Sequence, residues 1–389
     1  MYSAEQYLNE ETVFQLERFS DQAFKAASKA VKLKSIVRSV EDAVTTIKGP
    51  LLPWGLVPYY DTPYWDLLDS DQKLKLNHLS WALFYKLIAL AELPQTTAKT
   101  VFGARLTPYS SAKIRRYLFQ EAEEEIDHVA AHTAIANVVE KHYLGKACLN
   151  TEAIPITSVK SQSIPLVARL IAGYRRKGYA DQLLGTLQEN IKFVDLDGVS
   201  AFFDDEDPQM RLSKYAMYEA MKFTQVCYSR EWEHRVSRDE EVVRVAKNYA
   251  GHHNVDEARH VGWGKLAAIS FIEGLDDKDL SLAWSSMFVD YWRKYGTIFS
   301  LDPALLWWRT LPACMIAITQ NVFNVNEARA TEYVLDYLLT YKPSTVMQET
   351  SVGQATKIRK LMMELPLTAP DRAEILKTLD LLETHWQAV

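Results

Sequence analysis

The feature that most constrains this chain is a run of metal-ligating side chains at helical spacing. His253, Glu257 and His260 follow one another at steps of four and three residues. Each residue of an α-helix turns by about 100°, so these three side chains point within about 60° of one another. Two imidazoles and a carboxylate on one stripe suit iron, manganese or zinc. The run therefore predicts a helix that presents metal ligands to its packing partners.

A second, shorter motif lies upstream. Glu125 and His128 repeat the Glu-x-x-His spacing of Glu257 and His260. Two such motifs on two helices of a bundle, with one further Glu from each of the other two helices, form the ligand set of a carboxylate-bridged dinuclear site. The two motifs together predict a helical bundle with metal ions in its interior.

The composition agrees with a globular protein and excludes several other classes. Of the 389 residues, 48% are hydrophobic and 24% are charged, which suffices for a buried core. The net charge of −6 argues against a nucleic-acid partner, because phosphate binding needs a basic surface. No uncharged apolar run approaches the ~20 residues of a membrane span, and the polar, acidic start does not resemble a signal peptide. Three separated cysteines, Cys148, Cys227 and Cys314, are typical of a reducing cytoplasm.

Helical periodicity extends over most of the chain. Apolar residues recur at three- and four-residue steps, and no alternating strand pattern appears. We expect one all-α domain over residues 1–389, with a four-helix core at about 71–275 and with residues 1–70 and 276–389 packed on it. Residues 49–70, rich in proline and aromatic residues, are expected to form an irregular packed loop or a lid. The core helices are expected at about 71–94, 112–143, 212–234 and 240–273, as two antiparallel hairpins. Further helices are expected at about 166–179, 183–193, 281–295, 304–323, 327–341, 356–363 and 370–386.

Hairpin geometry selects candidates for the two remaining carboxylates. Residues that face each other in a hairpin average to the position of its turn. Glu92 pairs in this way with the first motif and Glu219 with the second, with midpoints near Tyr109 and Ser237, both in polar breaks. A Glu within an apolar stripe needs a partner, and the alternative to a metal is a buried Lys or Arg.

Other polar residues near the motifs fit a ligand role less well. Glu231 and Glu233 give midpoints inside an apolar helical run, and they lie among charged residues typical of a solvated helix end. Glu121 and His132 share the helix face of Glu125 and are candidate spare ligands, although a core polar role is the favoured interpretation.

Charged residues beside the motifs are candidates for supporting roles. Glu124 and Asp256 each precede a candidate ligand Glu, and they could reach a histidine on the facing helix and fix its tautomer. Arg259 could pair with Asp127 or Glu124. The alternative for all four is a surface ion pair worth less than ~1 kcal/mol.

The two motifs resemble those of ferritin-like non-haem diiron oxygenases over about residues 75–275. The resemblance is carried by Asp256-Glu257-Ala258-Arg259-His260 and by Glu125-Ile126-Asp127-His128. His253 is similar to the third histidine ligand of the p-aminobenzoate N-oxygenase (AurF-type) family. The resemblance implies a ferritin-like fold, two iron ions as cofactor, O2 as co-substrate and oxidation of an amine nitrogen. The ligands that it implies are Glu92, Glu125, His128, Glu219, His253, Glu257 and His260.

These expectations support three hypotheses. The first is a cytoplasmic diiron oxygenase, a candidate homodimer, that N-oxygenates a small-molecule amine in a biosynthetic pathway. Its electrons would come from a separate reductase or ferredoxin, because the sequence lacks a flavin or dinucleotide fingerprint. The second keeps the diiron site but changes the reaction to hydroxylation, desaturation or oxidative C–C cleavage. The third is a non-catalytic metal-binding helical bundle.

Overall fold

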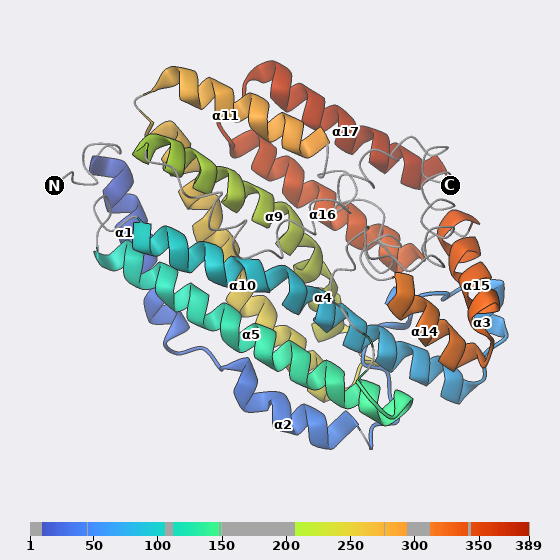
Figure 1. Ribbon diagram of the computed structural model, residues 1–389. Coiled ribbons are helices and arrows are strands. Elements are labelled where there is room, and N and C mark those ends of the chain that lie inside the picture. The colour runs from blue at the N-terminus through green and yellow to red at the C-terminus, as the bar shows by residue number, and fades with distance from the viewer. Residues whose placement is uncertain are drawn as a thin grey trace.

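The computed structural model describes residues 10–44, 46–105, 112–147, 149, 207–275, 277–293, 312–340 and 344–388. Every regular element within these ranges is a helix, as Figure 1 shows. The expected all-α class is therefore confirmed for the described residues.

Two helical hairpins form the centre of the molecule. One consists of α4 (Ser70–Arg105) and α5 (Ala112–Leu144), and the other of α9 (Pro208–Arg238) and α10 (Arg244–Glu273). The backbones approach most closely within each hairpin and less closely between the two hairpins. Long side chains therefore fill the space between the hairpins, and this space holds the polar residues discussed below.

The remaining helices cover this centre on two sides. Figure 1 shows α1 and α2 on one side of the core and α11, α16 and α17 on the opposite side. The contacts agree: α1 and α2 pack on α5 and α10, α11 and α16 pack on α9, and α14 packs on α4 and α15. The bounds are Glu10–Ala27 (α1), Leu33–Val44 (α2), Trp54–Leu56 (η2), Pro63–Asp66 (α3), Lys278–Tyr291 (α11), Pro312–Phe323 (α14), Glu327–Thr340 (α15), Thr345–Glu364 (α16) and Ala369–Ala388 (α17).

Two helix boundaries differ from the expectation in ways that matter for the site. The first core helix does not end at Pro94 but continues to Arg105. Proline removes one helical hydrogen bond, at a cost of ~3 kcal/mol, and burial of Ala98 and Phe102 beyond it offsets this cost. In the second hairpin, α9 ends at Arg238 and α10 begins at Arg244.

The turn of the second hairpin therefore lies later than Ser237. The Asp239 carboxylate accepts hydrogen bonds from the backbone N–H groups of Glu241 (2.9 Å) and Val242 (3.3 Å), which stabilises a non-helical turn there. Because the turn lies later, the residues of α9 that face the motif of α10 also lie later in the sequence than Glu219.

Several expected elements lie outside the described residues. These are the helices at 166–179 and 183–193, the start of the helix at 304–323, and the break around Tyr109. Cys148 also lies outside them. The expected helix at 356–363 is longer, because Ser344 caps α16 by accepting from the N–H of Met347 at 3.2 Å.

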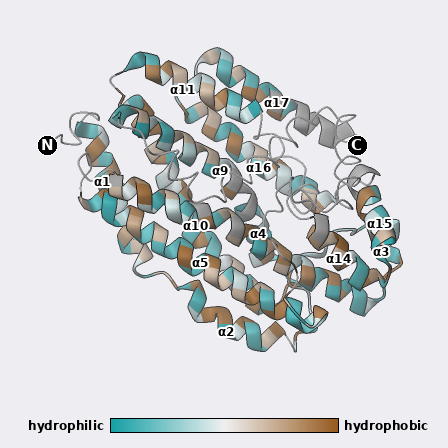
Figure 2. Ribbon diagram, viewed as in Figure 1, coloured by the Kyte–Doolittle hydropathy of each residue, from teal (hydrophilic) through white to brown (hydrophobic). Residues whose placement is uncertain are grey.

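A polar layer crosses the bundle between two hydrophobic clusters. Along each core helix the buried residues change from apolar to charged and back to apolar. Hydrophilic residues interrupt the hydrophobic ones along α5, as Figure 2 shows. The cluster at one end includes Trp81, Ile135, Trp232 and Tyr249, and the cluster at the other end includes Phe102, Tyr117, Tyr215 and Trp263.

Among the described helices none is both long and apolar enough to cross a membrane.

The irregular segment before α4 is fastened to that helix by two buried side chains. The Asn77 amide accepts from the N–H groups of Leu51 and Leu52 at 2.8 and 3.1 Å, and donates to the Leu52 carbonyl at 2.8 Å. His78 Nε2 lies 2.9 Å from the Gly49 carbonyl, and its Nδ1 lies 2.8 Å from the Tyr143 hydroxyl. Burial lowers the pKa of His78 to about 4, so the ring is neutral in the folded protein near pH 7.

The depressed pKa of His78 predicts an acid-sensitive fold. The unfolded chain binds this proton near pH 6.5 and the folded chain only near pH 4, so stability falls as the pH drops through that window. The loss is at most about 3 kcal/mol. Urea unfolding of metal-free wild type and His78→Asn from pH 7.5 to 4.5 measures it. The variant should lose less stability on acidification, and parallel profiles would contradict the assignment.

Gly264 gives α9 room to pack on α10. The Glu219 carboxylate of α9 lies against this glycine, and a Cβ there would stand 3.2 Å from Glu219 Cδ and closer still to one oxygen. Lys99 of α4 donates to the other Glu219 oxygen at 2.5 Å. The carboxylate is thus held between the backbone of one helix and the ammonium group of another.

We expect Gly264→Ala to lower stability by roughly 1–3 kcal/mol, since the added methyl group overpacks this contact. Gly251→Ala on the same helix is the matched control. Its nearest neighbour would be Ser237 Cβ at 3.9 Å, an ordinary contact. That change should stabilise the helix by roughly 0.5–1 kcal/mol. Thermal unfolding of both variants measures the difference, and equal shifts would contradict the packing described for Gly264.

Candidate metal centre

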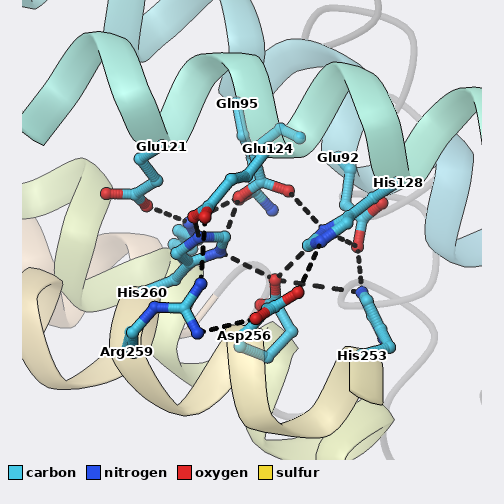
Figure 3. Close-up of polar contacts among 12 residues, drawn as sticks. Glu92, Gln95, Glu121, Glu124, His128, His253, Asp256, Arg259 and His260 are labelled. Atoms are coloured by element: carbon cyan, nitrogen blue, oxygen red, sulfur yellow. Dashed lines mark hydrogen bonds and ion pairs between the residues drawn. The ribbon is translucent and has the colours of Figure 1, made fainter. Parts of the chain in front are cut away.

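Buried histidines and glutamates converge in the polar layer as two adjoining groups. The first group is Glu92 of α4, His128 of α5, and His253 and Glu257 of α10; the second is Glu121 and Glu125 of α5 and His260 of α10. Within each group the ligand-type atoms lie within 4.8 Å of one another. Figure 3 shows Glu92, His128, His253 and His260 among them, pointing inward from α4, α5 and α10. The groups are called the first cluster and the second cluster below.

The spacing of atoms in the first cluster fits one bound cation. His253 Nε2 lies 2.9 Å from Glu92 Oε1 and 3.9 Å from Glu257 Oε1. His128 Nδ1 lies 3.9 Å from the same Glu92 oxygen and 3.7 Å from the same Glu257 oxygen. Donor atoms that surround one metal ion at about 2.1 Å are roughly 3–4 Å apart.

The second cluster shares carboxylates with the first. His260 Nδ1 lies 3.3 Å from Glu125 Oε1 and 2.9 Å from Glu257 Oε1. The other oxygen of Glu125 lies 3.6 Å from His128 Nδ1. The carboxylates of both Glu-x-x-His motifs therefore lie between the clusters, where a carboxylate can bridge two cations.

Buried atoms with unmet hydrogen-bonding capacity show that these residues fit a metal. Within the described part of the chain, no hydrogen-bond partner reaches His128 Nδ1, Glu121 Oε2 or Glu125 Oε2. A buried polar atom without a partner costs about 1–3 kcal/mol, and more if it is charged. A cation bound between the side chains would satisfy all three atoms at once.

Each histidine of the clusters contacts a further carboxylate. One ring nitrogen faces the clusters, and the other ring nitrogen faces this outer carboxylate. This arrangement is typical of metal-ligating histidines, because the outer carboxylate fixes the tautomer and orients the ring. The pairs are His128 Nε2 with Asp256 Oδ2 (3.5 Å), His253 Nδ1 with Glu233 Oε1 (2.7 Å) and His260 Nε2 with Glu124 Oε2 (2.9 Å).

Arg259 connects two of these outer carboxylates. Its guanidinium donates to Asp256 at 2.6 Å and to Glu124 at 3.0 Å, as Figure 3 shows. The structure thus places Glu124, Asp256 and Arg259 beside the clusters. Asp127 lies elsewhere, because its carboxylate accepts from the backbone N–H of Lys34 at 3.2 Å.

The expectation that Glu233 lies at a solvated helix end is wrong. Its side chain is fully buried, and it accepts a hydrogen bond from the Tyr85 hydroxyl at 3.1 Å. Burial raises the pKa of Glu233 despite the neighbouring His253. The error follows from the misplaced turn, and the capping pattern of Asp239 is the sequence signal that could have corrected it. Glu231 lies near Lys357 instead, outside the clusters.

Glu219 lies outside both clusters, and its partner is Lys99. A buried lysine was the alternative to a metal for this residue. In place of a carboxylate, α9 directs Lys222 toward the centre, where its Nζ donates to Glu121 Oε1 at 2.9 Å and to Glu125 Oε1 at 3.1 Å. The sequence indicated Glu121 as a candidate because it precedes Glu125 by four residues and shares its helix face. No sequence pattern indicated that Lys222 lies at the site.

The charges of the site shift several ionisation equilibria. Burial opposes ionisation of Glu121, but Lys222 and Lys99 hold its pKa down at about 2. Burial likewise opposes charge on His128, but the nearby Asp256 and Glu125 carboxylates raise its pKa to about 9. Because metal ligation requires the unprotonated ring, cation binding would release a proton from this site.

His132 lies beside the first cluster as a neutral ring. Burial lowers its pKa to about 4 despite the nearby Glu92 carboxylate. Its Nδ1 lies 2.8 Å from the Tyr249 hydroxyl, and its Nε2 lies 3.5 Å from Glu92 Oε2. Its hydrogen bond to Tyr249 agrees with the expected role as a buried polar residue of the core. The ring also faces the Glu92 carboxylate of the first cluster.

Comparison with known proteins agrees with a centre of this kind. Residues 56–277, more than half of the chain, match the family model described as acyl halogenase CylC-like. No curated protein matches the chain significantly. The match includes both hairpins and every residue of the two clusters, and it does not support the narrower likeness to the AurF-type N-oxygenases. The chain therefore belongs to the CylC-like acyl halogenase family, whose members are diiron-type oxidative enzymes.

Proposed function

We propose that this chain is a dinuclear iron enzyme that uses O2 to oxidise a small-molecule substrate. The observation that carries the proposal is the pair of adjoining clusters. In them His128 Nδ1, Glu121 Oε2 and Glu125 Oε2 are buried without a hydrogen-bond partner among the described residues, and each imidazole has an outer carboxylate. Buried polar atoms without partners are expected where a cation binds between them. A purely structural core has few such atoms, because each is costly.

The clusters support one set of ligands. Glu92, His128, His253 and Glu257 would hold one ion, and Glu121, Glu125 and His260 the other. Glu125 and Glu257 lie between the two groups and are the candidate bridging carboxylates. In this proposal Glu121 is a ligand in place of Glu219, which the sequence resemblance implied.

The buried charge supports two cations rather than one. Apart from Asp256 and Glu124, which share Arg259, six carboxylates and two ammonium groups are buried in and around the clusters, and these leave four negative charges when the histidines are neutral. Two divalent ions would neutralise them, since buried charge must be compensated. The carboxylates are Glu92, Glu121, Glu125, Glu219, Glu233 and Glu257, and the ammonium groups are those of Lys99 and Lys222.

The surroundings suit oxidative chemistry. Two reduced iron ions bound here would supply electrons and Lewis acidity for O2 activation. The protein holds the imidazoles in one tautomer through Asp256, Glu233 and Glu124. The hydrophobic clusters on both sides exclude water, which limits side reactions of reactive intermediates.

The family description favours halogenation of an acyl substrate as the reaction. Replacing a C–H hydrogen by halogen with O2 as oxidant consumes a halide, protons and two electrons from an external donor, and it releases two waters. This balance requires a separate reductase or ferredoxin. Amine N-oxygenation is the second candidate, and the third histidine ligand, His253, favours it. Turnover of acyl and arylamine substrates with and without bromide, followed by mass spectrometry, distinguishes the two.

Metal content tests the centre directly. Anaerobic loading of the wild type should give about two irons per chain. His260→Ala removes the only imidazole of the second cluster, so it should lower the content to about one. His252→Ala is the matched control, because His252 precedes a ligand on the same helix, is only half-buried and belongs to neither cluster. Iron analysis after desalting measures both variants.

Equal iron content in the two variants would contradict the assignment of His260. A wild-type protein that retains no iron after anaerobic loading would contradict the dinuclear centre itself.

A further inference from the structure

A stretch of positive charge at the end of α1 and the start of α2 contrasts with the acidic chain around it. The whole sequence has 50 aspartates and glutamates against 44 lysines and arginines. Between positions 22 and 40 there is no acidic residue, and all five cationic residues there are exposed. These five residues, called the basic patch below, are Lys25, Lys29, Lys32, Lys34 and Arg38.

Most of the charge of the basic patch is not compensated by nearby carboxylates. Lys25 pairs with Asp21 at 2.6 Å, and the same carboxylate pairs with Arg116 at 2.9 Å. Within the described ranges, the other four cations of the patch form no ion pair. Val31 lies among them and is 41% exposed. Exposed cations around an apolar side chain suit a protein partner of negative charge.

Two contacts place the basic patch over the helices that carry the metal ligands. Just before the patch, Ser20 of α1 accepts from the indole N–H of Trp263 at 2.9 Å, three residues after His260 on α10. Within the patch, the backbone N–H of Lys34 donates at 3.2 Å to Asp127, the residue before the ligand histidine of α5. The connection between α1 and α2 thus crosses from α10 to α5 beside the centre, and both helices pack on this side of the core (Figure 1).

The same side carries the outermost polar residues of the centre. Glu124 lies one helical turn before Asp127 on α5, and Arg259 lies one turn before Trp263 on α10, so both share the helix faces on which α1 and α2 rest. Their side chains pair at 3.0 Å and are each 12% exposed. Glu124 Oε2 in turn lies 2.9 Å from Nε2 of the ligand His260. One layer of side chains therefore separates this surface from the ligands.

This layer suits the passage of electrons better than the passage of a substrate. Arg259 donates to both Glu124 and Asp256, so the layer consists of side chains that are hydrogen-bonded to one another. Electrons tunnel through packed side chains, whereas a substrate needs an open channel. A redox partner that docks on this side could therefore reduce the centre without entering the protein.

Two other partners of a basic surface fit this patch less well. A nucleic acid is disfavoured by the net charge of −6. A membrane surface would bind the apolar face of α2, but that face is buried in the hydrophobic core through Leu33, Val37, Val40 and Val44. An acidic protein needs only the exposed cations.

We propose that the basic patch docks an acidic one-electron carrier protein, of the ferredoxin or flavodoxin class, that reduces the metal centre. This inference rests on the proposed function, whose balance requires two electrons from an external donor. Each encounter moves one electron from the reduced carrier through the layer of Glu124 and Arg259 and leaves the carrier oxidised. Two encounters supply both electrons, and no bond forms or breaks in the carrier. Such complexes are small and transient, and opposite charges speed their formation.

Binding of electron carriers tests the proposal without turnover. A plant-type [2Fe–2S] ferredoxin and a flavodoxin, both of acidic net charge, are the probes, and calorimetric titration of the purified protein measures their affinity. The wild type should bind both at about 0.01 M salt and lose binding at about 1 M salt, where charges are screened within about 3 Å. Lys29→Glu/Lys32→Glu should bind both about 10–100-fold more weakly, because attraction becomes repulsion at the patch.

The matched control is Lys360→Glu/Lys377→Glu, which changes the net charge of the protein by the same amount. Both lysines are exposed and lie on α16 and α17, on the opposite side of the bundle (Figure 1). This variant should keep the affinity of the wild type. Stopped-flow reduction of the iron-loaded protein by the reduced carriers should be slower in Lys29→Glu/Lys32→Glu alone.

If Lys29→Glu/Lys32→Glu does not fold, cross-linking of carrier carboxylates to wild-type lysines decides the matter. The proposal requires the linked lysines, mapped by mass spectrometry, to be those of the basic patch. Links confined to other lysines would contradict it.

Four results would overturn the proposal. They are no binding of either carrier by the wild type, equal affinity of the wild type and Lys29→Glu/Lys32→Glu, an equal loss in the control variant, and patch-dependent binding of an acyl carrier protein when neither electron carrier binds. A protein that takes up no iron would instead overturn the proposed function. Because the calorimetric titration needs no iron, the two failures are distinguishable.

Discussion

The structure depends on how a bundle tolerates a layer of buried negative charge. Glutamates from α4, α5, α9 and α10 lie within one layer, with apolar clusters above and below it. Each buried carboxylate would be costly alone. Imidazoles, two lysines and the proposed metal ions together offset that cost. Each of these groups brings together side chains of more than one helix. The layer therefore couples the two hairpins, whose backbones do not approach each other closely.

The three histidine–carboxylate pairs show how the layer fixes its own geometry. An imidazole that ligates a metal must present one nitrogen and carry its proton on the other. Asp256, Glu233 and Glu124 each bind the outer nitrogen, and Arg259 holds two of the three in place. The ring orientations are consequently set by the protein before any metal binds, which reduces the reorganisation that binding requires.

The centre is asymmetric, and the asymmetry originates in α9. This helix contributes a lysine to one half of the centre and the outer carboxylate Glu233 to the other. A dinuclear site built from four equivalent helices would have halves of similar charge. Here one half is rich in carboxylates and the other is partly neutralised by ammonium groups, so ions and exogenous ligands meet different environments in the two halves.

The sequence by itself determined the helical class and the residues of the two Glu-x-x-His motifs. Spacing along one helix is a local property, so His253, Glu257 and His260 had to share a face wherever the helix lies. It also identified Glu92, Glu124 and Asp256 as neighbours of the motifs. Only the tertiary structure decided which residues of α9 face the centre. That choice depends on the position of the turn at 239–243 and on the rotation of α9 about its axis. An error of a few residues in the position of the turn changes which side chains of α9 face the centre. For this reason Lys222, and not the expected Glu219, points into the clusters. Glu233, which was expected at a solvated helix end, lies in the buried layer.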